Sequence, residues 1–255
     1  MGRETARRLA QRGYQVLVTD LNEAGAQETA ESIGNGAWAM AQDVRDPESH
    51  RKAAAAAQER GPLKVWVNNA GILKTERIWD HPDDDVRLMV EVNLLATVWG
   101  ARAALEAMRA DPQGAHIINM ASMASFGPVP GLGIYAATKH GVLGLTESLQ
   151  GDLVLADMPI RVHAVCPDLV DTGMMREHAD NPAYALGFSG TKIYTPEEIA
   201  DEIVKLLDSE KIILSIPRNR MAVARLAGTF PRAGIKVAKL FLSTGERKQQ
   251  KFNAG

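Results

Sequence analysis

Residues 116–121, HIINMA, and the run at 133–156 that follows them decide the fold class of this chain. The first is a short apolar run bounded by polar residues, which is typical of a buried strand. The second carries Leu143, Leu149 and Leu153 and predicts a long helix with an apolar face. A strand followed by a long helix is the repeating unit of an α/β fold.

The same alternation continues along the chain in both directions. Further strands are expected at 15–20, 36–42, 64–67, 160–165 and 211–215, and further helices at 3–12, 22–32, 47–60, 82–95, 97–110 and 196–208. Strands alternating with helices of ten or more residues predict a parallel, doubly wound α/β sheet. The sequence has no internal repeat and no linker, so we expect one domain at 1–215 with 216–255 as its basic C-terminal extension.

Composition places the chain among ordinary globular proteins, with 45% hydrophobic and 24% charged residues. Its single cysteine, Cys166, cannot form an internal disulfide, which fits a reducing compartment and predicts a cytoplasmic protein. The six histidines show no metal-ligand spacing, so no metal site is expected. Net charge is −2 but uneven, because the stretch from Lys211 to the end holds ten Lys and Arg against one Asp or Glu.

Tyr135 and Lys139 open the long helix in the order YAATK, which places their side chains one turn apart on one face. A tyrosine hydroxyl ordinarily loses its proton at about pH 10, and a neighbouring ammonium lowers that pKa. Tyr135 is therefore a candidate to exchange a proton with an alcohol or carbonyl near neutral pH. Ser122, 13 residues before Tyr135, could hydrogen-bond the same oxygen. On its own, a Tyr/Lys pair at this spacing is usually part of a helix surface.

The wider pattern resembles the short-chain dehydrogenases/reductases over nearly the whole chain. NNAG at 68–71 matches the family segment after the fourth strand, and CPDLVDT at 166–172 looks like the segment that contacts nicotinamide. The family's catalytic tetrad is matched, in order and spacing, by Asn93, Ser122, Tyr135 and Lys139. The resemblance implies a Rossmann-type enzyme that transfers a hydride between NAD(H) and a secondary alcohol or ketone.

The resemblance also implies a role for each tetrad residue. Tyr135 would be the general acid/base, and Lys139 would lower its pKa and bind the nicotinamide ribose. Ser122 would orient the reacting oxygen, and Asn93 would hold a water that links Lys139 to solvent. The cofactor carries the hydride, while the protein supplies position and electrostatics.

Asp20, at the end of the second strand of that fold, predicts NAD as the cofactor. An acidic side chain there accepts hydrogen bonds from both ribose hydroxyls and repels a 2′-phosphate. The alternatives are a loop aspartate at position 20 and an NADPH-dependent ketoacyl-type reductase. The resemblance places further cofactor contacts at Gly2, Asp43, Val44, Asn69, Ala70, Gly71, Pro167, Val170 and Thr172. By itself, Asp43 is equally well explained as a turn residue.

The chain departs from the family pattern at two places. Of the glycine-rich phosphate turn only Met1 and Gly2 remain, so we expect the natural chain to begin about 12–20 residues earlier, with a first strand between 15–20 and 64–68. Asp168 stands where the family usually has glycine after the proline. Aspartate tolerates positive φ better than most residues, so the loop could keep its shape.

The substrate and the partners are predicted from the last third of the chain. The loop at 173–195 should cover the substrate, and the apolar residues in it suggest a lipid-, retinoid- or steroid-like alcohol or ketone: Met174, Met175, Tyr184, Leu186 and Phe188. Ordinary loop packing explains them equally well. The 216–255 extension, divided at Pro231 into two short helices, could lie on an anionic membrane or pack on the body.

The remaining expectations concern assembly. The 133–156 helix commonly forms a subunit interface in this family, so we expect a homodimer or homotetramer. No nucleic-acid-binding motif accompanies the basic tail, so no nucleic-acid partner is expected. The rival from another class is a non-catalytic relic or binding protein, because the phosphate turn is missing.

Overall fold

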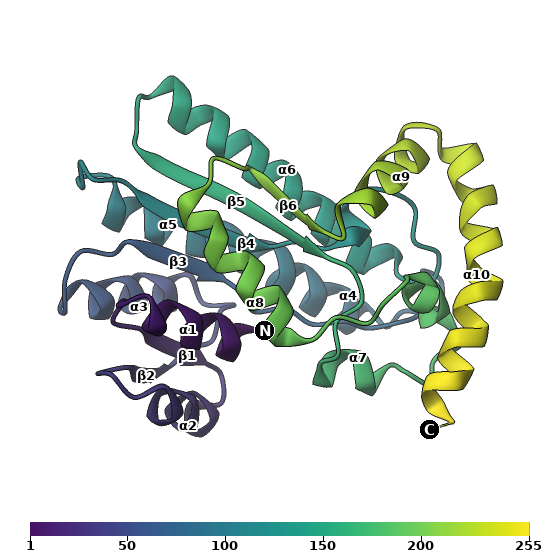
Figure 1. The fold of residues 1–255 in the computed structure, drawn as a ribbon, viewed down its shortest axis with the longest axis horizontal. Helices are drawn as coiled ribbons and strands as arrows, with labels where there is room; N and C mark the ends of the chain where they lie inside the picture. The colour runs from purple at the N-terminus through teal and green to yellow at the C-terminus, as the bar shows by residue number, and fades with distance from the viewer. Residues whose placement is uncertain (255) are drawn as a thin grey trace.

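The computed structural model describes residues 1–254, in which parallel strands alternate with helices (Figure 1). The strands are β1 (Leu17–Asp20), β2 (Trp38–Ala41), β3 (Val65–Asn68), β4 (Ala115–Met120), β5 (Ile160–Pro167) and β6 (Ile213–Ile216). The helices are α1 (Gly2–Gln11), α2 (Glu23–Ile33), α3 (Pro47–Gln58), α4 (Asp83–Val90), α5 (Ala96–Met108), α6 (Gly133–Leu155), α7 (Gly173–Glu177), α8 (Pro196–Val204), α9 (Arg218–Thr229) and α10 (Pro231–Asn253). A π-helical turn, η1 (Glu91–Leu95), and three 3-10 segments, η2 (Met123–Ser125), η3 (Pro182–Ser189) and η4 (Lys205–Asp208), complete them.

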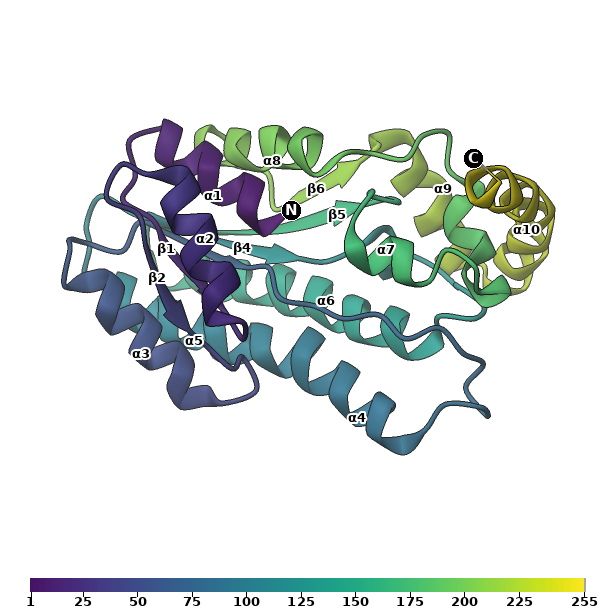
Figure 2. The same cartoon turned by 90° about the horizontal axis from the view of Figure 1, so that it is seen from below.

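All strand pairs are parallel, in the orders β1-β2 and β3-β4-β5-β6. Helices α1 and α8 cover one face of the strands, and α3, α5 and α6 cover the other (Figure 2). The predicted α/β fold with a parallel sheet is therefore confirmed. Parallel strands bring their carboxyl ends to one edge, where ligands bind in open α/β sheets.

The sheet is interrupted between β1 and β3. A cavity of about 630 Å³ lies between them, lined by Val18 on one side and Val65 on the other. Within residues 1–254 no strand pairs with either edge that faces this cavity. The further strand expected here from the sequence stays a prediction. Helix packing connects the two sheets, since α1 packs on α8 and Arg8 Nε bonds Asp201 Oδ1 at 2.9 Å.

Apolar side chains fill both faces of the four-stranded sheet. On one face, Ile118 of β4 packs with Ile199 and Ile203 of α8. On the other, its neighbour Ile117 packs with Met108 of α5. Alternate residues of a strand point to opposite faces, and each buried side chain of this size contributes about 1.5–3 kcal/mol. This core fixes the position of the carboxyl end of β4.

Helices α4 and α5 join through η1 into one segment, Asp83–Met108, where the sequence predicted two helices. By length and composition this segment could cross a membrane, but 44% of its most apolar window is buried inside the protein. Asn93 lies in the π turn and has no exposed surface. Such turns inside α-helices are frequent at functional sites.

Two helices follow β6, and they differ from the two short helices expected around Pro231. Helix α9 is short, but α10 runs through 23 residues and packs along η3. A Cβ at Gly245 would overlap the carbonyl oxygen of Ala185, so the two backbones are in direct contact.

Hydrogen bonds reinforce that packing. Gln249 Nε2 donates to the carbonyl oxygens of Ala179 and Asn181, each at 2.8 Å. The stretch 168–195 contains α7 and η3, and α10 packs against η3. The loop expected at 173–195 is therefore partly helical.

Candidate active site

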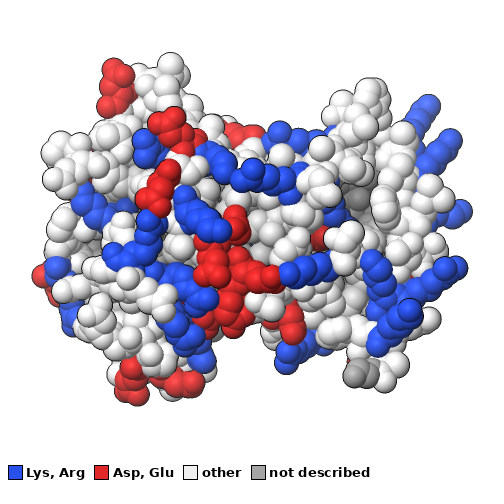
Figure 3. Space-filling model, viewed as in Figure 1, with Lys and Arg blue, Asp and Glu red and all other residues white. Residues whose placement is uncertain are grey.

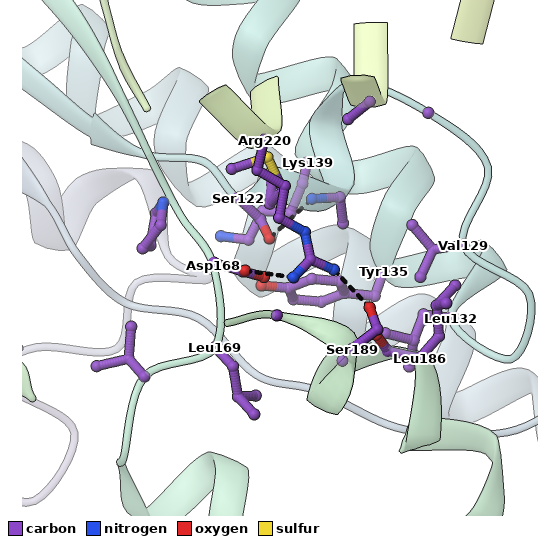
Figure 4. Close-up of a pocket in the computed structure, with 18 of the residues that line it drawn as sticks. Ser122, Val129, Leu132, Tyr135, Lys139, Asp168, Leu169, Leu186, Ser189 and Arg220 are labelled. Atoms are coloured by element: carbon purple, nitrogen blue, oxygen red, sulfur yellow. Dashed lines mark hydrogen bonds and ion pairs between the residues drawn. The ribbon is translucent and has the colours of Figure 1, made fainter. Parts of the chain in front are cut away.

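Three of the tetrad side chains meet at the carboxyl end of β4. Ser122 follows the strand and caps η2, while Tyr135 and Lys139 lie on the first turns of α6 (Figure 4). The Lys139 Nζ lies 5.7 Å from the centre of the Tyr135 ring. Together with Asn93 they line or border one cavity, so the structure brings together the residues that the sequence predicted as catalytic.

Lys139 is held in a buried position. Its Nζ donates a 2.7 Å hydrogen bond to the carbonyl oxygen of Met120, the last residue of β4. Its side chain is 4% exposed, and burial lowers the pKa of its ammonium to about 8. The strand end therefore positions a lysine that can lose or carry a proton near neutral pH.

Tyr135 experiences two opposing influences. Burial raises the pKa of its hydroxyl, and a hydrogen bond with Ser122 lowers it. The lowering by Lys139 that the sequence predicts stays a prediction, since the Lys139 ammonium bonds the Met120 carbonyl in this structure. A positive charge bound above the ring would act in the same direction as Ser122, towards the phenolate.

Asn93 reaches the site through the loop after β3. Its Oδ1 accepts from the backbone N–H of Ile72 at 2.8 Å, and its Nδ2 donates to the Ile72 carbonyl at 2.9 Å. A Cβ on Gly71 would lie 3.3 Å from Asn93 Oδ1 and 3.5 Å from Lys139 Nζ. Glycine at position 71 therefore lets the loop pass close to both polar groups.

Two predicted cofactor residues, Asn69 and Gly71, also line this cavity, and Gly2 lies next to them. Gly2 begins α1, and a Cβ there would lie 2.7 Å from Asn69 Nδ2, so the start of α1 touches the loop Asn69–Gly71 that also carries Ala70. Backbone N–H groups at a helix start favour phosphate. Binding of a dinucleotide by Gly2, Asn69, Ala70 and Gly71 stays a prediction.

Asp20 and Asp43 follow neighbouring parallel strands. Asp20 ends β1, is exposed, and accepts a 2.9 Å hydrogen bond from the Asn22 backbone. Asp43 pairs with Arg45 at 2.6 Å, and these bonds lower the pKa of its carboxyl. Asp43 Oδ1 also accepts from the Arg45 N–H at 2.9 Å, as expected of a turn residue, while the Val44 carbonyl bonds His50. Contact of Asp43 and Val44 with adenine stays a prediction.

The segment after β5 contributes three predicted residues. Pro167 ends the strand, Val170 is buried beside β6, and Thr172 caps α7 by accepting from the Met175 N–H at 3.3 Å. All three line the cavity that contains Tyr135. Their contact with nicotinamide stays a prediction.

Asp168 has a role that the sequence did not predict. Among the described residues the non-glycine positions with positive φ are Asn35 and Asp157, so Asp168 does not use the left-handed backbone expected for it. Its carboxylate pairs with Arg220 of α9 at 2.6 Å, and Arg220 also donates to Ser189 Oγ at 2.6 Å (Figure 4). An acidic residue in the glycine position was the only signal in the sequence.

The substrate end of the cavity is mainly apolar. The whole cavity has a volume of about 460 Å³ and includes Ser122 and Tyr135. Met174, Met175, Tyr184 and Leu186 line it as expected, while Phe188 packs behind Tyr184. A further wall, made by α9 and α10, was not predicted from the sequence. It consists of Val223, Ala224, Ala227, Gly234, Val237, Ala238 and Phe241.

Cys166 lies under the site without entering it. It is fully buried, and burial raises the pKa of its thiol to about 12. The group is therefore a neutral thiol that packs as a small apolar side chain.

Comparison with known proteins supports the same family. The probable oxidoreductase EphD of Mycobacterium tuberculosis is 29% identical over 94% of this chain, which spans 43% of that relative's length. Estradiol 17-beta-dehydrogenase 11 of Mus musculus is 28% identical over 94% of this chain and 79% of its own. A short chain dehydrogenase/reductase from Burkholderia phymatum, solved in complex with NAD, superposes with a TM-score of 0.80 at 25% identity, covering 88% of each chain.

A family model confirms the assignment. The model described as short chain dehydrogenase matches residues 1–183, which include β1 to β5 and the whole predicted tetrad. The match extends beyond half of the chain and agrees with the observed fold. The chain therefore belongs to the short chain dehydrogenase family of oxidoreductases.

Proposed function

We propose that this protein interconverts an apolar secondary alcohol and its ketone with NAD(H). The observation that carries the proposal is one cavity that is lined by Ser122 and Tyr135, by Gly71 of the loop after β3 and by many apolar side chains. Such a cavity accommodates a reacting oxygen beside the tyrosine and an apolar body beyond it.

The residues of this chain would divide the work as follows. Bound nicotinamide supplies the carbon that accepts or donates the hydride. In the oxidation, Tyr135 as phenolate takes the proton of the substrate hydroxyl, and Ser122 hydrogen-bonds the same oxygen. Lys139, buried beside the ring, stabilises the phenolate, and Asn93 donates both to the Ile72 carbonyl and to Thr138 of α6. The apolar wall excludes water from the reacting carbon.

Asp20 supports NAD over NADP in this proposal. Its carboxylate is exposed at the end of β1, and no ion pair with it is formed by residues 1–254. A 2′-phosphate placed there would meet an uncompensated negative charge. The ketoacyl-type reductase that uses NADPH is the alternative within the enzyme class.

The proposal includes a homo-oligomer in the cytoplasm with peripheral membrane contact. On α6, Leu143 and Leu153 are buried in the protomer's own core, so they are not free for a partner. The exposed apolar residues Val154 and Leu155 at the end of α6 offer a subunit contact instead. The membrane contact would use the basic C-terminal extension.

Steady-state formation of NADH with secondary alcohols of increasing chain length tests the proposal. We expect kcat/KM to rise with chain length until the cavity is filled, and Tyr135→Phe to lower kcat by about 10²–10⁴-fold while NADH binding is retained. Equal activity of Tyr135→Phe and the unchanged protein would refute the role of Tyr135. NADPH and NADH compared with the same substrate separate the two cofactor proposals.

The non-catalytic alternative rests on the cavity between β1 and β3. A dinucleotide site divided between two sheets would lose the preorganised pyrophosphate-binding turn that α/β enzymes use. NADH titration followed by fluorescence distinguishes the two, because a relic would show no saturable binding even when its fold is intact by circular dichroism.

A further inference from the structure

Helices α9 and α10 present an unusually apolar surface to solvent. Phe230, between the helices, is 59% exposed, and Ile235 and Leu240 of α10 are 55% and 74% exposed. On α9, Leu226 is 62% exposed. We refer to these side chains, together with the basic residues of the same two helices, as the α9–α10 face. Apolar residues gathered on one element generally mark an interaction site.

The same face is strongly basic. Arg232, Lys236 and Lys239 of α10 are exposed, and no ion pair involving them is found within residues 1–254. Figure 3 shows the Lys and Arg side chains of α10 projecting from the right-hand end of the molecule. The acidic residue in this stretch is Glu246, near the far end of α10. The face therefore carries a net positive charge beside its apolar side chains.

The substrate cavity reaches this face. Val223 of α9 is 50% exposed and Phe241 of α10 is 43% exposed, yet both also line the cavity that contains Tyr135. Figure 3 shows a hollow in the surface next to α10. The cavity is also lined by Asn69, an exposed residue that contacts the start of α1. The cavity is thus lined both by residues of this face and by a predicted cofactor residue.

We propose that the α9–α10 face docks on an anionic lipid bilayer and that the apolar substrate enters from the bilayer between α9 and α10. This inference deepens the membrane contact of the proposed function and rests on that function for the nature of the substrate, but the docking does not depend on the proposed activity. Basic side chains attract an anionic leaflet, and adjacent apolar side chains enter its interface. The open end of the cavity would then face the phase in which an apolar alcohol dissolves.

Side-chain bonds hold α9 and α10 in place beside the cavity. Arg220 joins α9 to Asp168 and Ser189, and Lys248 of α10 bonds the carbonyl oxygen of Gly190. Both helices are therefore tied to the segment that follows β5. Lipid contact would be transmitted to a rigid wall rather than to a free tail.

Cosedimentation of the whole chain with phosphatidylcholine vesicles, with and without phosphatidylglycerol, tests the docking. The test variant is Lys236→Gln with Lys239→Gln, and its matched control is Lys52→Gln with Arg109→Gln, two exposed cations on α3 and after α5. Each lysine near an anionic leaflet contributes about 1 kcal/mol, so the test variant should bind about thirtyfold more weakly and the control unchanged. Leu240→Ser should weaken binding further.

Entry from the bilayer is tested by kinetics. The measured quantity is the ratio of kcat/KM for a long-chain secondary alcohol dissolved in anionic vesicles to kcat/KM for a short water-soluble one. We expect this ratio to fall at least tenfold in the Lys236/Lys239 variant and not in the control. An unchanged ratio despite lost binding would overturn the entry route.

Other results separate the proposals. Equal sedimentation of the test variant and the control would overturn the docking. If Leu240→Ser instead changes the molecular mass in solution and leaves vesicle binding intact, the face binds a second copy of the chain and the docking is overturned. Normal vesicle binding without turnover of either alcohol would refute the proposed function and support the docking.

Discussion

Replacement of Arg220 by methionine tests how the ion pair beneath α9 stabilises the protein. The Asp168 side chain is 7% exposed and the Arg220 side chain 27%, so the pair is largely removed from water. Loss of one partner of a buried pair costs about 3–5 kcal/mol. Because Arg220 is partly exposed, we expect Arg220→Met to lower the free energy of unfolding by about 2–3 kcal/mol.

The loss should depend on pH in a defined direction. Burial raises the pKa of Asp168 above its ordinary value, while Arg220 lowers it. A raised pKa means that the folded state binds the proton more tightly than the unfolded chain, so stability falls as pH rises through the folded-state pKa. Without Arg220 the pKa rises further. The deficit of Arg220→Met should therefore be smaller in mildly acidic buffer than at neutral pH.

Urea unfolding of the two single variants and the double variant completes the test. Asp168→Asn combined with Arg220→Met leaves no unpaired charge, so the double variant should lose only about 1 kcal/mol, less than Arg220→Met alone. Single losses that simply add in the double variant would show that the two side chains do not interact, and the reasoning would be refuted.

Three further predictions each concern the replacement of one residue. Asp20→Ser should raise the NADP:NAD ratio of kcat/KM about tenfold or more, because the like charge facing a 2′-phosphate is removed; an unchanged ratio would exclude Asp20 from cofactor choice. Lys139→Met should abolish turnover yet raise the free energy of unfolding at neutral pH by about 1–2 kcal/mol, because it removes a buried ammonium whose pKa burial lowers to about 8. The stability gain should shrink as pH rises from 8 towards the ordinary lysine pKa, since the wild-type lysine then loses its charge. A thermal melt of lower midpoint would contradict this prediction. Gly245→Leu should detach α10 and increase its cleavage by trypsin, with Gly144→Leu, where a Cβ meets nothing within 4 Å, as control.

The central fold and the tetrad were accessible from the sequence because both depend on local patterns. Apolar runs that alternate with helical periodicity predict β4, α6 and their order, and Tyr135 and Lys139 share a helix face whatever the rest of the chain does. The strand beginnings were less accurate: β1 starts at Leu17 rather than at residue 15, since the first residues of a strand are defined by its partner.

The wall of the substrate cavity was not accessible. Arg220 meets Asp168 across 52 positions of sequence, and Val223 and Phe241 approach Tyr135 only after α9 and α10 fold back on η3. No periodicity within residues 216–255 indicates which part of the domain this segment will cover. Pro231 divides the extension into two helices as expected, because it occupies the first turn of α10, where proline is favoured. Only the length of α10 was missed.

The break between β1 and β3 has a consequence for the motion of the two parts and for the exchange of their amide hydrogens. The unit formed by α1, β1, α2 and β2 is held to the remainder by helix packing and a few side-chain bonds such as Arg12 to Asp208. Such a unit can open as a separate cooperative block, so amide hydrogens of β1 should exchange faster than those of β4. Asp20 belongs to this block and Tyr135 to the other. A dinucleotide held at both ends would clamp the blocks together, and saturating NADH should slow exchange most strongly in β1.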